Sequence, residues 1–129
     1  MPNFNTGGRR SPLPWLLLSL RGRISRAIYW LSYLLIVSVQ SALLAQLVGA
    51  EEASLHRLAA SIGPVVLFAT IYCSLAVSVK RLHDVGYSGF LAIAILIPFL
   101  NVAFAIWVGI LPGTTGPNAY GDAPDVAPS

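Results

Sequence analysis

One short polar segment, residues 80–89, carries the side chains best suited to chemistry. It contains two cations, a carboxylate and an imidazole, and an imidazole titrates near neutral pH. Such a set suits either proton transfer by His83 with Asp84, or an anion such as a phosphate or phospholipid headgroup held among cationic side chains. In the simpler interpretation, Lys80 and Arg81 end a membrane helix, His83 faces water and Asp84 supports a turn.

Further arginines precede the first long apolar run of the chain. If the apolar helices pack together, both basic segments meet at one face, where Asp84 can pair with an arginine of the first segment. The candidate polar cluster therefore consists of Arg23, Arg26, Lys80, Arg81, His83 and Asp84. A second candidate motif, in the C-terminal tail, consists of Asn118, Tyr120 and Gly121. The sequence leaves open whether this tail folds back onto the helices.

The composition favours a bilayer rather than water as the solvent. Of the 129 residues, 56% are apolar and 10% are charged, against roughly 25% charged in soluble domains. The mean hydropathy of +0.73 agrees. The net charge of +3 is spread around the apolar runs, which argues against a nucleic-acid partner. We assign no catalytic residue, cofactor or metal site, because the sequence has no motif with the required spacing.

Three uncharged runs are each long enough to cross the hydrocarbon, which takes about 20 residues. We predict an all-α integral membrane protein with a membrane domain over 13–111, preceded by a disordered segment and followed by an irregular tail. The predicted parts are a disordered segment 1–12, a short interfacial helix 13–20, transmembrane helices at about 27–49, 58–79 and 88–111, and a tail 112–129.

A proline interrupts the third run. Pro98 is expected to kink this helix, with Asn101 either satisfying the freed carbonyl group or contacting a ligand. Two half-spans folded as a hairpin around Pro98 are the alternative, and each would be too short to cross the bilayer.

The distribution of charge predicts how the chain is threaded. Seven of the 8 Lys and Arg residues fall before the first span or between the second and third, and Arg57 is the exception. The positive-inside rule therefore places the N-terminus and the polar segment in the cytoplasm. With three spans, the C-terminal tail lies on the periplasmic or extracellular side.

Several motifs in order resemble one family of small bacterial inner-membrane proteins, catalogued as a domain of unknown function, number eight hundred and five. The resemblance covers about residues 13–124. It rests on Gly22-Arg23-Ile24-Ser25-Arg26 with Tyr29-Trp30, Arg81 to Phe90, Ile97-Pro98, Gly113 to Gly116, Asn118 to Gly121, and Pro124. Where the family has Lys-Glu before the Tyr-Trp pair, this chain has Ala27-Ile28, so no role of that acid carries over. The resemblance implies a cytoplasmic membrane and a few helices, and no reaction.

The leading hypothesis is a non-enzymatic membrane module that binds anionic phospholipid headgroups or a membrane-protein partner at its cytoplasmic basic face. The alternative is a membrane enzyme or transport subunit that uses His83 and Asp84 for proton transfer. A third possibility is a homo-oligomer joined through small residues at helical spacing, namely Ser41, Ala45, Ser74 and Ser78.

Overall fold

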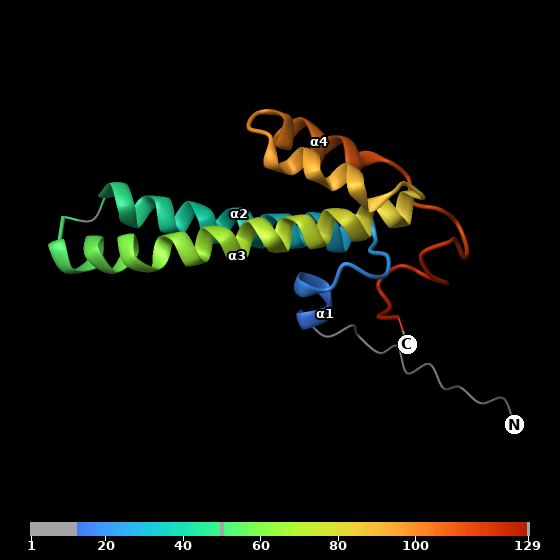
Figure 1. The fold of residues 1–129 in the computed structure, drawn as a ribbon, viewed down its shortest axis with the longest axis horizontal. Helices are drawn as coiled ribbons and strands as arrows, with labels where there is room; N and C mark the ends of the chain where they lie inside the picture. The colour runs from blue at the N-terminus through green and yellow to red at the C-terminus, as the bar shows by residue number, and fades with distance from the viewer. Residues whose placement is uncertain (1–12, 50, 129) are drawn as a thin grey trace, which may run out of the picture.

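Two long helices, α2 (Arg26–Gly49) and α3 (Ala53–Val85), form the frame of the computed structural model, which describes residues 13–49 and 51–128. They run antiparallel, side by side along the longest axis (Figure 1). Both are long and apolar enough to cross a membrane. At 1.5 Å per residue, α3 is about 50 Å long, which exceeds a hydrocarbon core of about 30 Å. Its polar ends therefore extend beyond any hydrocarbon layer that its middle crosses.

The end of α3 is set by a glycine. Gly86 adopts φ 93°, the left-handed conformation that a side chain disfavours. Its N–H donates to the carbonyl of His83, and the N–H of Tyr87 donates to that of Leu82. These bonds close the last turn, so the helix continues to Val85, beyond the end predicted at residue 79, and includes the first part of the polar segment.

Residues 88–111 form a hairpin, so the prediction of one continuous transmembrane helix here is wrong. A 3₁₀ helix, η1 (Gly89–Leu96), is followed by a tight turn and then by α4 (Leu100–Ile110). The hairpin folds back over one end of the α2–α3 pair (Figure 1). At 1.5 Å per residue α4 is about 16 Å long, half of the hydrocarbon thickness.

The chemistry of the turn explains the reversal. Pro98 has no N–H to continue a helix, and Phe99 takes φ 65° and ψ −40°, a positive φ that is rare for a residue with a side chain. The backbone N–H of Asn101 donates to the carbonyl of Ile97 at 3.0 Å. The Asn101 side chain makes no hydrogen bond to the other described residues, so it takes no part in closing this turn.

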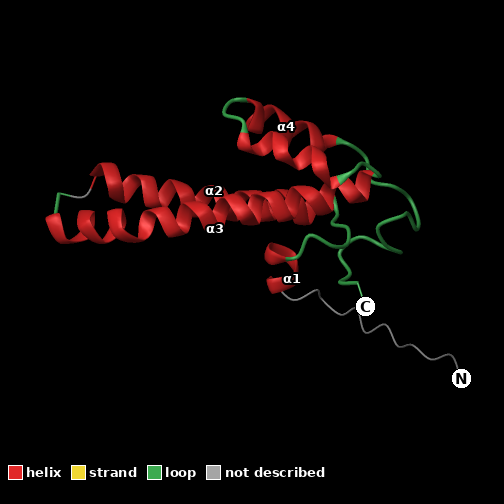
Figure 2. Ribbon diagram, viewed as in Figure 1, coloured by secondary structure: helices red, strands yellow, loops and turns green. Residues whose placement is uncertain are grey.

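Helix α1 (Leu13–Leu18) and the tail complete the fold at the end of the molecule where α3 stops. The tail has turns and bends, with an isolated bridge between Asn118 and Gly121. Helices and loops make up the described residues, with no strand among them (Figure 2). The predicted disordered segment 1–12 lies outside the described residues.

The tail lies against the polar segment, so the prediction that a membrane separates the two is wrong. The N–H of Thr114 donates to the carbonyl of Asp84 at 2.7 Å. Because η1 and α4 form a hairpin, the chain leaves α4 at the end where it entered η1. The buried core lies at this same end and draws on the segment before α2 and on α2, α3, η1 and α4: Ile24, Tyr29, Val77, Leu82, Ala92, Phe104 and Val108. Apolar side chains of α1 pack against it.

Candidate functional site

The candidate site is an arginine–aspartate cluster, made of Arg23, Arg81 and Asp84, in which one carboxylate joins two guanidinium groups. Arg23 donates from Nε to Asp84 Oδ1 at 3.0 Å, and its Nη2 lies 3.0 Å from the same oxygen. Arg81 donates from Nη1 to Asp84 Oδ2. Both arginines are completely buried and Asp84 nearly so. Buried charges are tolerated only when paired and hydrogen-bonded, as these are.

The rest of the Arg23 guanidinium holds the C-terminal tail. Nη1 donates to the carbonyls of Gly116 and Gly121, at 2.7 and 3.0 Å, and Nη2 donates to that of Thr114 at 2.7 Å. Arginine carries five donors in a fixed planar fork. Four of the five donate hydrogen bonds here, and Nη2 also lies within ion-pair distance of Asp84, so the buried Arg23 is not free to bind an external anion.

Arg81 also connects three segments, through its two Nη groups, whereas its buried Nε has no partner among the described residues. Beyond Asp84, its Nη1 donates to the carbonyl of Ile24 and its Nη2 to that of Leu111, at the end of α4. The tail then passes very close to the carboxylate. A Cβ on Gly113 would lie 3.0 Å from Asp84 Cγ, so only glycine fits at this position.

Lys80 faces α1 rather than the cluster. Its Nζ donates to the carbonyls of Trp15, at 3.2 Å, and Ser19. The ammonium also lies 5.3 Å from the centre of the Trp15 ring, within cation–π range. Carbonyls at the end of a helix lack internal partners, so Lys80 both caps α1 and holds it against α3.

His83 contacts the tail motif directly. Its ring stacks on that of Tyr120 with centres 4.0 Å apart, and Asn118 Nδ2 donates to its carbonyl at 2.8 Å. Its Nδ1 lies 3.2 Å from the carbonyl oxygen of Gly22. His83 lies outside the apolar part of α3 predicted to cross the membrane, residues 58–79. Burial lowers its pKa from the ordinary value of 6.5, although the Gly22 carbonyl acts in the opposite direction.

The structure thus brings all six predicted cluster residues and the whole tail motif to one end of the molecule. Arg26 differs from the other cations of the set in that its side chain is exposed and outside the arginine–aspartate cluster. Sequence reasoning missed Asp125, whose Oδ1 accepts from the backbone N–H of Ser25 at 2.8 Å. An acidic residue in a tail without periodicity gave no local sign of this contact.

The four small residues predicted as a possible contact between copies of the chain fall into two groups. Ser74 and Ser78 are buried within the chain, where Ser78 lies 3.4 Å from the hydroxyl of Tyr33. Ser41 and Ala45 are exposed on α2. Only the second pair is available to another molecule. Within residues 13–49 and 51–128, no three His, Cys, Asp or Glu side chains are grouped so that they could hold a metal ion.

Comparison with known proteins agrees with the membrane character of α2 and α3. A family model described as "Protein of unknown function (DUF805)" matches residues 17–122. The inner membrane protein YhaH of Escherichia coli K12 is 30% identical over 113 residues, covering 86% of this chain and 91% of YhaH. The inner membrane protein YhaI of the same strain is 31% identical over 105 residues, covering 80% and 83%. No solved structure matches.

Proposed function

Because the chain belongs to the DUF805 family, whose relatives are inner-membrane proteins, we propose that it is a non-enzymatic membrane module that binds anionic phospholipid at its cytoplasmic end. The lipid contacts come from Arg21 and Arg26 and not from the arginine–aspartate cluster. The observation that carries this proposal is the division of the cations into two sets. Arg23, Arg81 and Lys80 are buried, whereas Arg21 and Arg26 are exposed.

Helix α1 supplies the apolar part of the same surface. Leu13, Leu18 and Leu20 are exposed, next in sequence to the exposed Arg21. Tyr72 donates to the carbonyl of Leu18 at 2.7 Å, which fixes the end of α1 on α3. An exposed apolar edge beside cations is typical of a helix at the headgroup boundary. We therefore place α1 in the interface, its leucines toward acyl chains and Arg21 toward phosphate groups.

The proposed threading has two transmembrane helices, α2 and α3, and a re-entrant hairpin made of η1 and α4. The basic end faces the cytoplasm, because every Lys and Arg except Arg57 lies before α2, at its first residue or in the last turns of α3. The tail is bonded to this same end through Arg23. Both termini are accordingly proposed to be cytoplasmic, and only the link between α2 and α3 faces the periplasm.

The lipid proposal can be tested by native mass spectrometry. Each Lys or Arg near an anionic surface contributes about 1 kcal/mol, so removing two should weaken retention of phosphatidylglycerol about 30-fold relative to phosphatidylcholine. We expect this loss in the double variant Arg21→Ala, Arg26→Ala. The matched control is Arg57→Ala, which removes an exposed cation from the opposite end and should leave retention unchanged. Equal retention in all three proteins would refute the proposal.

The bonds of Asp84 argue against the alternative of proton transfer by His83 and Asp84. Both of its carboxylate oxygens already accept hydrogen bonds from arginines. Neither oxygen of Asp84 is therefore free to bond to the His83 ring, whose own contacts are with Tyr120 and Gly22. His83 alone would have to carry the transfer, and its Nδ1 is engaged with Gly22.

A further inference from the structure

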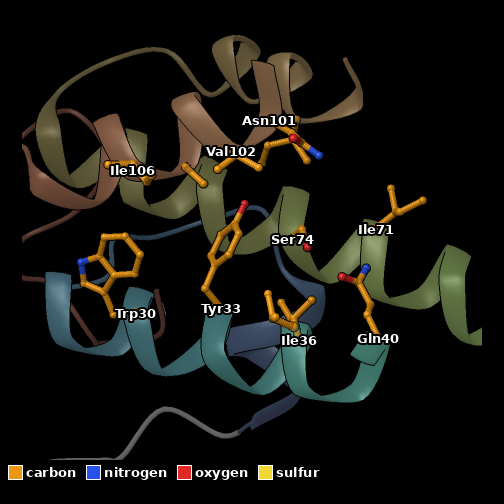
Figure 3. A pocket seen from close by; sticks show the side chains of 12 residues that line it. Trp30, Tyr33, Ile36, Gln40, Ile71, Ser74, Asn101, Val102 and Ile106 are labelled. Atoms are coloured by element: carbon orange, nitrogen blue, oxygen red, sulfur yellow. The ribbon is translucent and has the colours of Figure 1, made fainter. Parts of the chain in front are cut away.

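A cleft lies between α2, α3 and the hairpin, separate from the arginine–aspartate cluster. Its volume is about 340 Å³, at the lower end of the range of small-molecule sites, about 300–1,000 Å³. Most of its lining is apolar, with four polar side chains: Tyr33, Gln40, Ser74 and Asn101. Figure 3 shows the amides of Gln40 and Asn101 directed from opposite walls, α2 and α4, toward the same space.

The Asn101 side-chain amide has no hydrogen-bond partner among the residues that the structure describes. The side-chain hydrogen bonds of residues 13–49 and 51–128 include none from Asn101, although its backbone N–H is bonded to Ile97. A primary amide in a low-dielectric layer without a partner is strongly unfavourable. Because this amide takes no part in closing the turn at Pro98, it is available to a bound molecule.

Gln40 presents a complementary group. Its Nε2 donates to Thr70 Oγ1 at 3.1 Å, and that hydroxyl lies 2.9 Å from the carbonyls of Val66 and Leu67, one of which accepts its hydrogen. This bond fixes the Gln40 side chain and directs its Oε1 away from Thr70. The cleft therefore offers one amide with free donors and acceptor, from Asn101, and a second acceptor, from Gln40.

The depth of the cleft excludes a charged ligand. Gln40 lies 14 positions after Arg26, which is about 21 Å along α2 and well below the headgroups. No Lys, Arg, Asp or Glu lines the cleft. An ion at this depth would have no counter-charge. The ligand must therefore carry an uncharged polar head.

An apolar groove continues from the cleft. Gln40 also lines a second hollow of about 700 Å³, whose other walls are apolar residues of α2 and α3 such as Leu43, Leu47, Gly63 and Leu67. The α2 residues that line the cleft and the groove recur at helical spacing, so they lie on one face of α2. Their positions are 33, 36, 37, 40, 43, 44 and 47. The groove runs from beneath the hairpin along this face, and its length suits a hydrocarbon chain.

We propose that the cleft binds an uncharged, single-chain or isoprenoid amphiphile. Its uncharged head accepts a hydrogen bond from Asn101 Nδ2, a hydroxyl head also donates one to Gln40 Oε1, and its hydrocarbon chain lies in the groove between α2 and α3. A long-chain alcohol and an isoprenoid quinone share the acceptor and the chain. The site differs from the proposed binding of anionic phospholipid, because it lies in the membrane interior and contains no cation.

The test is photo-crosslinking of the full chain in nanodiscs with three diazirine probes: hexadecanol, a short-tailed ubiquinone and phosphatidylglycerol. We expect saturable labelling by the first or second probe and none by the third within the cleft, mapped by peptide mass spectrometry. The probe that labels identifies the source of the ligand. Non-saturable labelling, or preference for phosphatidylglycerol, would overturn the proposal.

Variants separate binding from folding. Asn101→Leu should lower labelling about tenfold, because one hydrogen bond to the head is lost. It should also raise the unfolding temperature of lipid-free protein, since the unpaired amide is gone. Val102→Trp keeps both amides and fills the cleft, so it should block labelling even if Asn101→Leu folds poorly. Ser38→Ala, on the exposed face of α2, is the control and should label normally. Unchanged labelling in Asn101→Leu and Val102→Trp would refute the site.

Discussion

Arg23 donates from Nε to Asp84 Oδ1 at 3.0 Å and joins segments 61 positions apart, one before α2 and the other in the last turn of α3. The same guanidinium binds three carbonyls of the tail, and Arg81 on the other side of Asp84 binds the end of α4. One buried carboxylate thus organises the entrance to α2, the exit of α3 and the return of the tail.

Removing the carboxylate should cost more stability than removing any other acid of the chain. In Asp84→Ala two arginines remain buried without their counter-charge, and breaking a buried pair in this way costs about 3–5 kcal/mol. We expect a large drop in the thermal unfolding midpoint in detergent, followed by intrinsic tryptophan fluorescence.

The matched control for this prediction is Asp122→Ala, which removes an exposed carboxylate of the same tail. Its unfolding midpoint should equal that of the native chain. If Asp84→Ala unfolds at the same temperature as Asp122→Ala, then the cluster does not hold the fold together.

The hairpin should detach from α2 when Gly109 gains a side chain. A Cβ there would lie 2.7 Å from Trp30 Cε2 and 3.0 Å from Tyr29 Cε1, and Trp30 also donates to the Gly109 carbonyl at 3.3 Å. Overpacking of this kind costs about 1–3 kcal/mol. We expect Gly109→Ala to lower the unfolding midpoint and to increase hydrogen exchange in α4.

Gly49→Ala makes the same chemical change at the end of α2, where nothing lies within 4 Å of the added Cβ. It should leave both measurements unchanged. Identical behaviour of the two glycine variants would mean that α4 does not pack on α2 as described.

The attachment of the tail should weaken as the pH falls below neutrality. Burial lowers the pKa of His83 below 6.5, and nearby Lys80 adds to this effect. Above pH 6.5 the ring is neutral in both folded and unfolded chains, and its contribution to stability is complete. As the pH falls from 6.5 toward the folded-state pKa, the unfolded chain binds the proton more readily, so stability is lost.

We therefore expect the unfolding midpoint of the native chain to drop between pH 7 and pH 5 by more than that of His83→Gln. His56→Gln, at the exposed far end of α3, should retain the full pH dependence. A flat profile in His56→Gln, or an undiminished slope in His83→Gln, would assign the effect to another group.

The two long helices could be predicted from the sequence because an uncharged run of more than 20 residues has few alternatives. The hairpin formed by η1 and α4 could not be predicted in this way. Pro98 in an apolar run is compatible with either a kink or a reversal, and the choice depends on Phe99 adopting φ 65°. Packing of Gly109 against Trp30, far apart in sequence, decides in favour of reversal, and no local pattern reports that contact.

The arginine–aspartate cluster could likewise be predicted only in part from the sequence. The residue types were predicted, and Arg23 is the arginine of the first segment that pairs with Asp84. The sequence did not predict which cations are free to bind an external anion. The partners of Arg23 and Lys80 are largely backbone carbonyls, and every residue has one. Side-chain patterns cannot indicate which carbonyls a buried cation will meet.

The side of the membrane on which the tail lies tests the account most directly. In spheroplasts of a Cys73→Ser background, a membrane-impermeant maleimide should label Ser54→Cys, in the exposed start of α3. It should not reach Ala123→Cys, in the tail held by Arg23, until the cells are lysed. Labelling of Ala123→Cys in intact spheroplasts would place the tail outside and contradict the return of the chain to the Arg23–Asp84 end.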